Sequence, residues 1–177
     1  MRSKSNLISE DFAFKNNIEE NKFSQRTAWG IAVTGGMIYN GISGEGEDPF
    51  YPTHAAAAER MDTCMMHPAN EVLHYHAAGS CAADTSTSQW ELKNEKIELQ
   101  SIVKESRQKR PYREVFGLSF DGRPIYSPYY KNGKLYEGCD VDVCNGMYID
   151  GEYGYVSTIF HPYIMGCYGP GSNPGFS

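Results

Sequence analysis

The segment GIAVTGGMIY at residues 30–39 returns in altered form as GLSFDGRPIY at residues 117–126, an offset of 87 residues. Both copies follow the pattern Gly-Φ-x-Φ-x-Gly-x-x-Ile-Tyr, in which Φ is an apolar residue. Apolar residues alternate on each side of a Gly-Gly or Asp-Gly turn, which is typical of a β-hairpin. The two copies therefore predict two versions of one structural unit.

A second pair of matching segments follows the hairpins. The run Asp62-Thr-Cys64 aligns with Asp142-Val-Cys144, an offset of 80 residues. At that same offset Leu73-His-Tyr-His76 falls on Tyr153-Gly-Tyr-Val156. Order and spacing agree across both matches, so we predict two half-units, at about 29–81 and 116–168. Only the first half-unit keeps a His-Tyr-His strand.

The rest of the chain predicts a mainly β fold with a few helices. A long helix is expected at residues 89–106, because Ser88 and Glu91 form a capping box before an apolar face. It lies in a predicted insert at about 88–108. A short helix is expected after Thr53. The fold class is thus β-rich α+β, with one long and one or two short helices. Residues 27–177 form one domain, and the polar residues 1–26 an arm that can be exchanged between subunits.

Composition excludes two classes of partner. The net charge of −6 comes with no basic stripe, which argues against nucleic-acid binding. No run of about 18 apolar residues is present, so no membrane span is expected. The chain is rich in tyrosine, with 13 residues. Tyr126, Tyr129 and Tyr130 could form a carbohydrate-binding surface of rings, or could pack in the core.

The five cysteines indicate disulfides and hence an oxidising, extracellular setting. Cys64 and Cys144 are equivalent in the repeat, and each precedes a strand and then another cysteine. We therefore predict the pairs Cys64–Cys81 and Cys144–Cys167. Cys139 would then be a free or inter-chain thiol. A Cys139–Cys167 pair is the main alternative.

The histidines of the first half-unit suggest a metal site. In a strand, His74 and His76 point to the same face, roughly 6–7 Å apart. His67 could supply a third ligand, and His161 or Asp121 a fourth. Imidazole suits a transition metal such as copper or zinc. Two alternatives remain open. The histidines could be structural, bonded to loop backbones, or could serve in metal-free acid–base chemistry.

These residues resemble the YHYH domain family of secreted proteins. The resemblance covers about residues 29–171, in the segments GIAVTGGMIYNG, DTCMMH, LHYHAAGSC, GLSFDGRPIYSPYY, DVDVCNGMYIDGEYGYVSTIFHPY and MGCYGPG. The family typically has Tyr-His-Tyr-His where this chain has Leu73 in the first position. The resemblance implies an extracellular, disulfide-bonded protein, and it implies no enzyme activity.

Three functional hypotheses follow. The leading one is an extracellular structural or interaction module that assembles with copies of itself, and arm exchange that does not close would give a filament. The second is a metal-binding protein or metalloenzyme centred on His67, His74 and His76. The third is a carbohydrate-binding protein. An enzyme is the less favoured reading.

Overall fold

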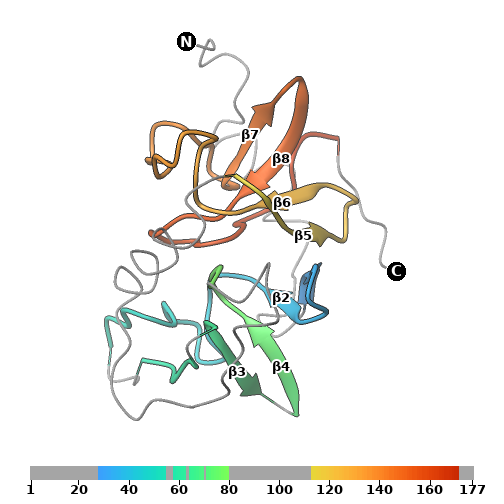
Figure 1. Cartoon of the computed structure of the whole chain (residues 1–177). Coiled ribbons are helices and arrows are strands. Elements are labelled where there is room, and N and C mark those ends of the chain that lie inside the picture. Colours follow the sequence, from blue (N-terminus) through green and yellow to red (C-terminus); the bar gives the residue numbers. More distant parts are fainter. Residues whose placement is uncertain (1–27, 55–57, 63, 70, 80–112, 172–177) are drawn as a thin grey trace.

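The described part of the chain folds into one mixed β-sheet. The computed structural model describes residues 28–54, 58–62, 64–69, 71–79 and 113–171. Eight strands lie in the order β3-β4-β2-β1-β5-β6-β8-β7 (Figure 1). Their bounds are β1 Ala28–Ala32, β2 Met37–Tyr39, β3 Met66–Ala69, β4 Val72–Tyr75, β5 Val115–Ser119, β6 Pro124–Tyr126, β7 Gly146–Ile149 and β8 Glu152–Val156.

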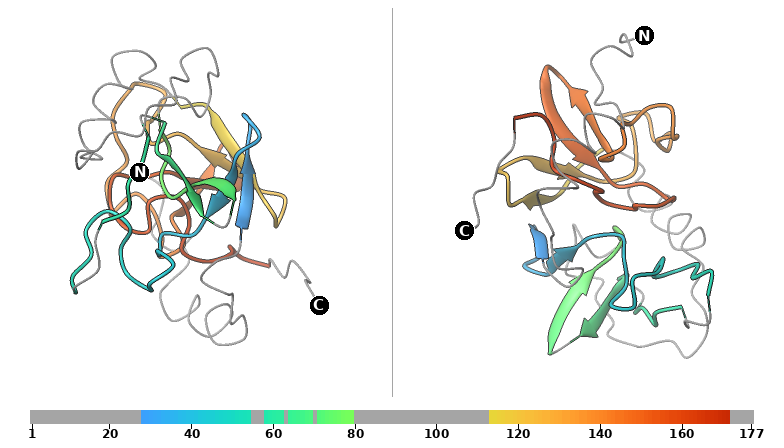
Figure 2. Two further views of the ribbon diagram at one scale, coloured as in Figure 1. Left: turned by 90° about the horizontal axis from the view of Figure 1, so that it is seen from below. Right: turned by 180° about the vertical axis from the view of Figure 1, so that it is seen from behind.

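The strand order reads as two identical halves that meet in the middle. Strands β1 to β4 form one half and β5 to β8 the other, so that β3 and β7 lie at the two edges. The right-hand view of Figure 2 shows the two halves at opposite ends of the molecule. In each half, a hairpin (β1–β2 or β5–β6) pairs in parallel with the inner strand of a second hairpin (β3–β4 or β7–β8).

The pairing registers of the two halves correspond at the offsets found in the sequence. The pair Gly30↔Ile38 becomes Gly117↔Ile125 at the offset of 87. Within the second hairpins, Met66↔Tyr75 becomes Gly146↔Tyr155 at the offset of 80. Two residues in the left-handed region, Met65 and Asn145, are also equivalent, with φ of 64° and 57°. The two half-units therefore share backbone conformation as well as strand order.

The halves are joined by antiparallel pairing of β1 with β5. Ile31 faces its own equivalent, Leu118, at the centre of this pairing. The first glycine of each hairpin motif makes the approach possible. A Cβ at Gly30 would lie 2.6 Å from the carbonyl oxygen of Leu118, and one at Gly117 would lie 2.7 Å from that of Ile31. Both positions thus require glycine for steric reasons.

Equivalent residues from both halves form the main core cluster. Ile38 and Ile125 are fully buried in it, beside Tyr75 and Tyr155. Trp29 stacks on Tyr168, with ring centroids 5.3 Å apart. Two smaller clusters lie beside it, one formed mostly by first-half residues and one within the second half. One continuous core thus spans the join, so the halves stabilise each other.

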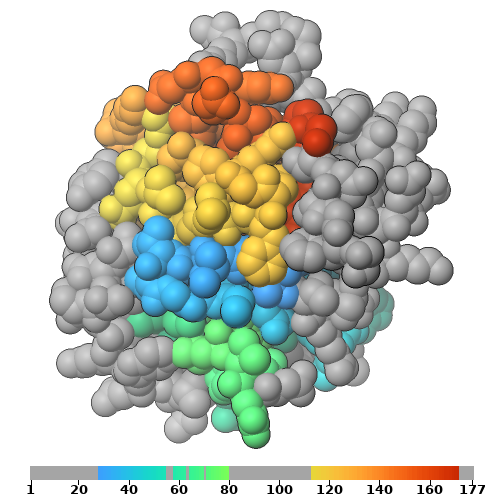
Figure 3. Space-filling view, turned by 90° about the vertical axis from the view of Figure 1, so that its right-hand side faces the viewer, coloured from blue at the N-terminus to red at the C-terminus, as the bar shows by residue number. Residues whose placement is uncertain are grey.

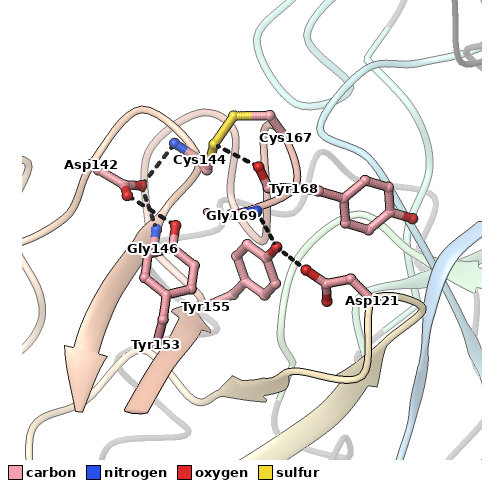
Figure 4. Close-up of a disulfide and its surroundings, with 9 residues drawn as sticks. All are labelled: Asp121, Asp142, Cys144, Gly146, Tyr153, Tyr155, Cys167, Tyr168 and Gly169. Carbon is pink, nitrogen blue, oxygen red and sulfur yellow. Dashed lines mark hydrogen bonds between the residues drawn. A yellow bond between two sulfur atoms is a disulfide. The ribbon is translucent and has the colours of Figure 1, made fainter. Parts of the chain in front are cut away.

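The disulfide prediction is confirmed where the structure describes it. Cys144 and Cys167 are bonded, with Cα atoms 4.7 Å apart, and Figure 4 shows this disulfide beside the Asp142 turn. The alternative pair Cys139–Cys167 is therefore wrong, and Cys139 is a free, exposed thiol. Cys64 is disulfide-bonded as well. Its predicted partner, Cys81, lies outside the described residues.

The helices are the part of the prediction that finds no support. The described residues contain no helix. The predicted long helix at 89–106 and the arm at 1–26 lie outside them, as do residues 55–57 of the predicted short helix. Residues 58–61 of that short helix are described and are not helical. Strand β3 was not predicted. It contains Pro68, which is tolerated because β3 is an edge strand.

A band of apolar side chains lies on the outer face of the two central strands. Figure 3 shows the two central hairpins side by side on one face of the molecule. The exposed members of the band are Ile31, Val33, Val115, Leu118 and Phe120, at 40–59% exposure.

No helix among the described residues has the length and apolarity needed to cross a membrane.

A pair of residues that differs between the halves offers a test of the repeat. A Cβ at Gly146 would lie 1.8 Å from the hydroxyl oxygen of Tyr153, so Gly146→Ala should lower the free energy of unfolding by about 1–3 kcal/mol. The first half has Met66 and Leu73 at these positions. Adding Tyr153→Leu should therefore recover part of the loss in a urea-unfolding double-mutant cycle. Additive losses would contradict this packing.

Candidate metal centre

Two strands of the first half bring three histidines to one face of the sheet. His74 lies in β4, and His76 follows two residues later, so both side chains point the same way. His67 lies in the edge strand β3 directly opposite His74 in the antiparallel register. The ring centroids of His67 and His74 are 4.3 Å apart, and those of His74 and His76 are 4.8 Å apart.

Backbone carbonyls fix the orientation of two of these rings. Nδ1 of His74 lies 3.1 Å from the carbonyl oxygen of Val72, and Nδ1 of His76 lies 2.6 Å from that of Asn40. A carbonyl oxygen only accepts hydrogen bonds, so each Nδ1 carries the proton. In the neutral ring, Nε2 then presents a lone pair. This is the outer-shell arrangement that orients histidine ligands in metal sites.

The Nε2 lone pairs converge on one point. One ring nitrogen from each of His67, His74 and His76 lies within 4.8 Å of the others. Nε2 of His74 and Nε2 of His76 are 3.1 Å apart. With both Nδ1 atoms protonated, two lone pairs face each other at this distance, so a cation must lie between them. A proton on one ring or a metal ion would satisfy this condition.

Glu59 places a carboxylate oxygen at the same point. Its Oε2 lies 2.6 Å from Nε2 of His67 and 3.3 Å from Nε2 of His76. Neither Oε2 of Glu59 nor Nε2 of His67 has a hydrogen-bond partner with acceptable geometry among the described residues, although both atoms are buried. Burial would raise the pKa of the Glu59 carboxyl, but contact with His67 and His76 lowers it well below its ordinary value. Glu59 is therefore ionised and aimed at the histidines.

Burial keeps the central histidine neutral. His74 is 1% exposed. Its ring stacks on Tyr39, with centroids 3.9 Å apart and an interplanar angle of 23°. Burial lowers the pKa of His74 to about 4. Neutral imidazole is the form that binds a metal ion.

The donor set fits a four-coordinate transition metal. Ligands about 2.0–2.1 Å from a tetrahedral zinc ion lie about 3.3 Å from one another. The distances of 3.1 Å between Nε2 of His74 and Nε2 of His76, and of 3.3 Å between Nε2 of His76 and Oε2 of Glu59, are close to this value. Three imidazoles and one carboxylate suit zinc or copper. Small shifts of His67 and Glu59 would complete the geometry.

The equivalent place in the second half has no histidine. Met147, Gly154 and Val156 stand where the first half has His67, His74 and His76. Val156 is fully buried, in a cluster with Tyr126 and Met147. A Cβ at Gly154 would lie 3.1 Å from the ring of Tyr126, the equivalent of Tyr39. Apolar packing thus replaces imidazole in this half, and the centre belongs to the first half alone.

The other candidate residues lie elsewhere. Asp121 accepts a hydrogen bond from Tyr155 at 2.6 Å, and the His161 ring packs on Tyr163, so neither completes the centre. His54 is a surface residue paired with Glu47. Among the three tyrosines considered for carbohydrate, Tyr129 is buried and Tyr126 and Tyr130 are partly buried against the second-half core. These positions give a carbohydrate-binding surface no support.

Sequence reasoning missed Glu59 and the backbone anchors. Glu59 follows a run of alanines and has no acidic equivalent in the repeat, where Cys139 stands at the offset of 80. Nothing in its local pattern ties it to the histidines. Tyr39 was visible as part of the hairpin motif, and its equivalence to Tyr126 was predicted. Its stacking on His74 depends on the parallel pairing of β2 with β4.

Comparisons with known proteins leave the family open. No family model matches the chain, and neither a curated protein nor a solved structure matches it. The histidine centre is therefore the feature that bears on function.

The buried His74 predicts how the stability of the metal-free protein depends on pH. Its ordinary pKa is about 6.5, and burial lowers it to about 4 in the folded chain. Between these values the unfolded chain binds a proton that the folded chain does not, so the free energy of unfolding falls as the pH decreases. In urea unfolding with EDTA at pH 7 and pH 5, His74→Gln should show a smaller fall than the wild type.

The exposed His54 supplies the control for this measurement. Its side chain is 81% exposed, so His54→Gln should reproduce the wild-type fall. An unchanged fall in His74→Gln would show that His74 does not titrate as a buried neutral ring.

Proposed function

We propose that this protein binds one transition metal ion, zinc(II) or copper, through His67, His74 and His76. The convergence of their Nε2 lone pairs carries the proposal, because Nδ1 of His74 and of His76 already donates to a backbone carbonyl. A purely structural histidine cluster would use its second nitrogen as well, in a hydrogen bond to the protein. Here Nε2 of His67 and Oε2 of Glu59 remain without such a bond, which favours a metal ligand role.

The proposed role is binding rather than a defined reaction. A catalytic zinc or copper ion needs a coordination position that a water or substrate can take. Glu59 lies where a fourth ligand would lie, next to His67 and His76. The side chains of His67 and Glu59 are 12% and 18% exposed, so this is also the side of the centre nearest to solvent.

An extracellular location is part of the proposal. The Cys144–Cys167 disulfide and a further bonded cysteine, Cys64, support it, because disulfides persist in oxidising compartments. The resemblance to the secreted YHYH family points the same way. In that setting the metal ion would be taken from the surroundings of the cell.

Metal analysis tests the proposal directly. Metal-free wild-type protein titrated with zinc(II), and separately with copper(II), should bind one ion per chain in isothermal titration calorimetry. Elemental analysis after gel filtration should give the same ratio. The double variant His74→Ala/His76→Ala should lose this stoichiometric ion, because two of the imidazole ligands are gone.

His54→Ala is the matched control, since this histidine is exposed and lies outside the centre. It should bind as the wild type does. Retention of one ion per chain in His74→Ala/His76→Ala, or no binding by the wild type, would contradict the proposal.

Self-association is a second candidate, supported by the apolar band on β1 and β5. Ile31 and Leu118 lie at 40% and 49% exposure beside the local two-fold axis between the halves. Ile31 and Val33 match Leu118 and Phe120 at the offset of 87, so the band presents apolar residues on both sides of this axis. A two-fold contact between copies of the chain would use this same patch on both copies. Contiguous exposed apolar side chains are typical of interaction surfaces.

Replacing one residue of the band should weaken this association. Leu118→Asp places a charge at its centre and is expected to shift an oligomer toward the monomer in size-exclusion chromatography with light scattering. Val72→Asp, at a 38% exposed position in β4, controls for an added charge outside the band. Unchanged assembly in Leu118→Asp would remove the band as the interface.

A further inference from the structure

The turn before β3 and its equivalent before β7 are held by the same aspartate contacts. Oδ1 of Asp62 accepts hydrogen bonds from the N–H groups of Cys64 and Met66, both at 2.8 Å. Oδ1 of Asp142 accepts from those of Cys144 and Gly146, both at 2.9 Å, as Figure 4 shows. Oδ1 of each aspartate thus accepts the two equivalent backbone hydrogen bonds in its half.

The second oxygen differs between the halves. Oδ2 of Asp142 accepts a hydrogen bond from the hydroxyl of Tyr153 at 2.9 Å. Leu73 stands at the position of Tyr153 in the first half and offers no donor. Oδ2 of Asp62 is accordingly buried without a hydrogen-bond partner among the described residues, and the residue is only 3% exposed. Burying a carboxylate oxygen without a hydrogen bond costs free energy, which a nearby positive charge can offset.

The histidine centre is a source of positive charge close to Asp62 in the chain. Burial raises the pKa of Asp62, the hydrogen bonds from the N–H groups of Met66 and Cys64 lower it, and the charge of His67 lowers it further. His67 also contacts Glu59 through Nε2. Glu59 thus contacts two of the imidazoles directly. Asp62 is held next to them, because its Oδ1 accepts a hydrogen bond from the N–H of Met66, the residue before His67.

We propose that Asp62 is the charge-balancing residue of the metal centre, and that the centre is thereby selective for a divalent ion over a monovalent one. This inference rests on the proposed function. A divalent ion bound to three neutral imidazoles is neutralised by two carboxylates, those of Glu59 and Asp62. A monovalent ion such as copper(I) would leave one buried negative charge uncompensated. In the second half, which has no histidines, the tyrosine hydroxyl stabilises the aspartate instead.

The two equivalent aspartates give a matched pair of variants. Asp62→Asn and Asp142→Asn both keep an amide oxygen for the turn and both remove one negative charge. Zinc(II) affinity is measured at pH 7.5 by competition with a chromophoric chelator. Asp62→Asn should weaken it by about 10–100-fold, the range for residues behind the ligands. Asp142→Asn should bind zinc(II) as the wild type does.

Copper(I) affinity separates a charge effect from a distorted site. The Coulomb energy with Asp62 is twice as large for a divalent as for a monovalent ion at the same place. Asp62→Asn should thus lower the logarithm of the zinc(II) affinity about twice as much as that of copper(I), measured anaerobically with bicinchoninate. Asp62→Ser, which keeps a turn-forming oxygen, should behave like Asp62→Asn.

The affinities of the Asp62 variants for the two ions decide whether Asp62 acts through its charge. Equal losses for both ions would indicate a structural role and overturn it, as would unchanged zinc(II) affinity in both Asp62 variants. In either case wild-type zinc binding, and with it the proposed function, would stand. Absence of zinc binding by the wild type would overturn both the function and this inference.

Discussion

The structure depends on one antiparallel pairing, that of β1 with β5. Gly30 and Gly117 allow these strands to approach, and Ile31 meets its equivalent Leu118 at the centre. This pairing makes one eight-stranded sheet from two four-stranded ones, and one core from two apolar faces. The exposed apolar band and the position of the histidines at one end both follow from it.

The repeat explains why the centre can exist in one half only. The turn aspartates and the strand registers are shared by both halves, so the scaffold does not depend on histidine. In the second half, apolar packing around Val156 and the Tyr153–Asp142 hydrogen bond fill the same places. The first half instead places charged and ionisable groups there, and burying such groups costs free energy unless they are paired.

The sequence predicted the parts of the structure that rest on local pattern. Hairpin alternation and Gly turns located β1, β2, β5 and β6, and the equivalence of Cys64 with Cys144 led to the Cys144–Cys167 disulfide. The convergence of His67 with His74 and His76 was also predicted. Glu59 was not, because a loop residue reaches the centre through the path of the chain rather than through any period. The carbonyl anchors on His74 and His76 were equally invisible, since every residue has a carbonyl.

The central pairing has a consequence for how such a chain could arise. A half-unit standing alone would expose the edge of β1, and its unpaired N–H and C=O groups would seek a partner strand. A second copy related by a two-fold axis supplies that strand in the register seen between β1 and β5. The fold thus has the arrangement expected of a homodimer whose two subunits are joined in one polypeptide. Fusion frees each half to accept its own substitutions, which a dimer encoded by one gene cannot do.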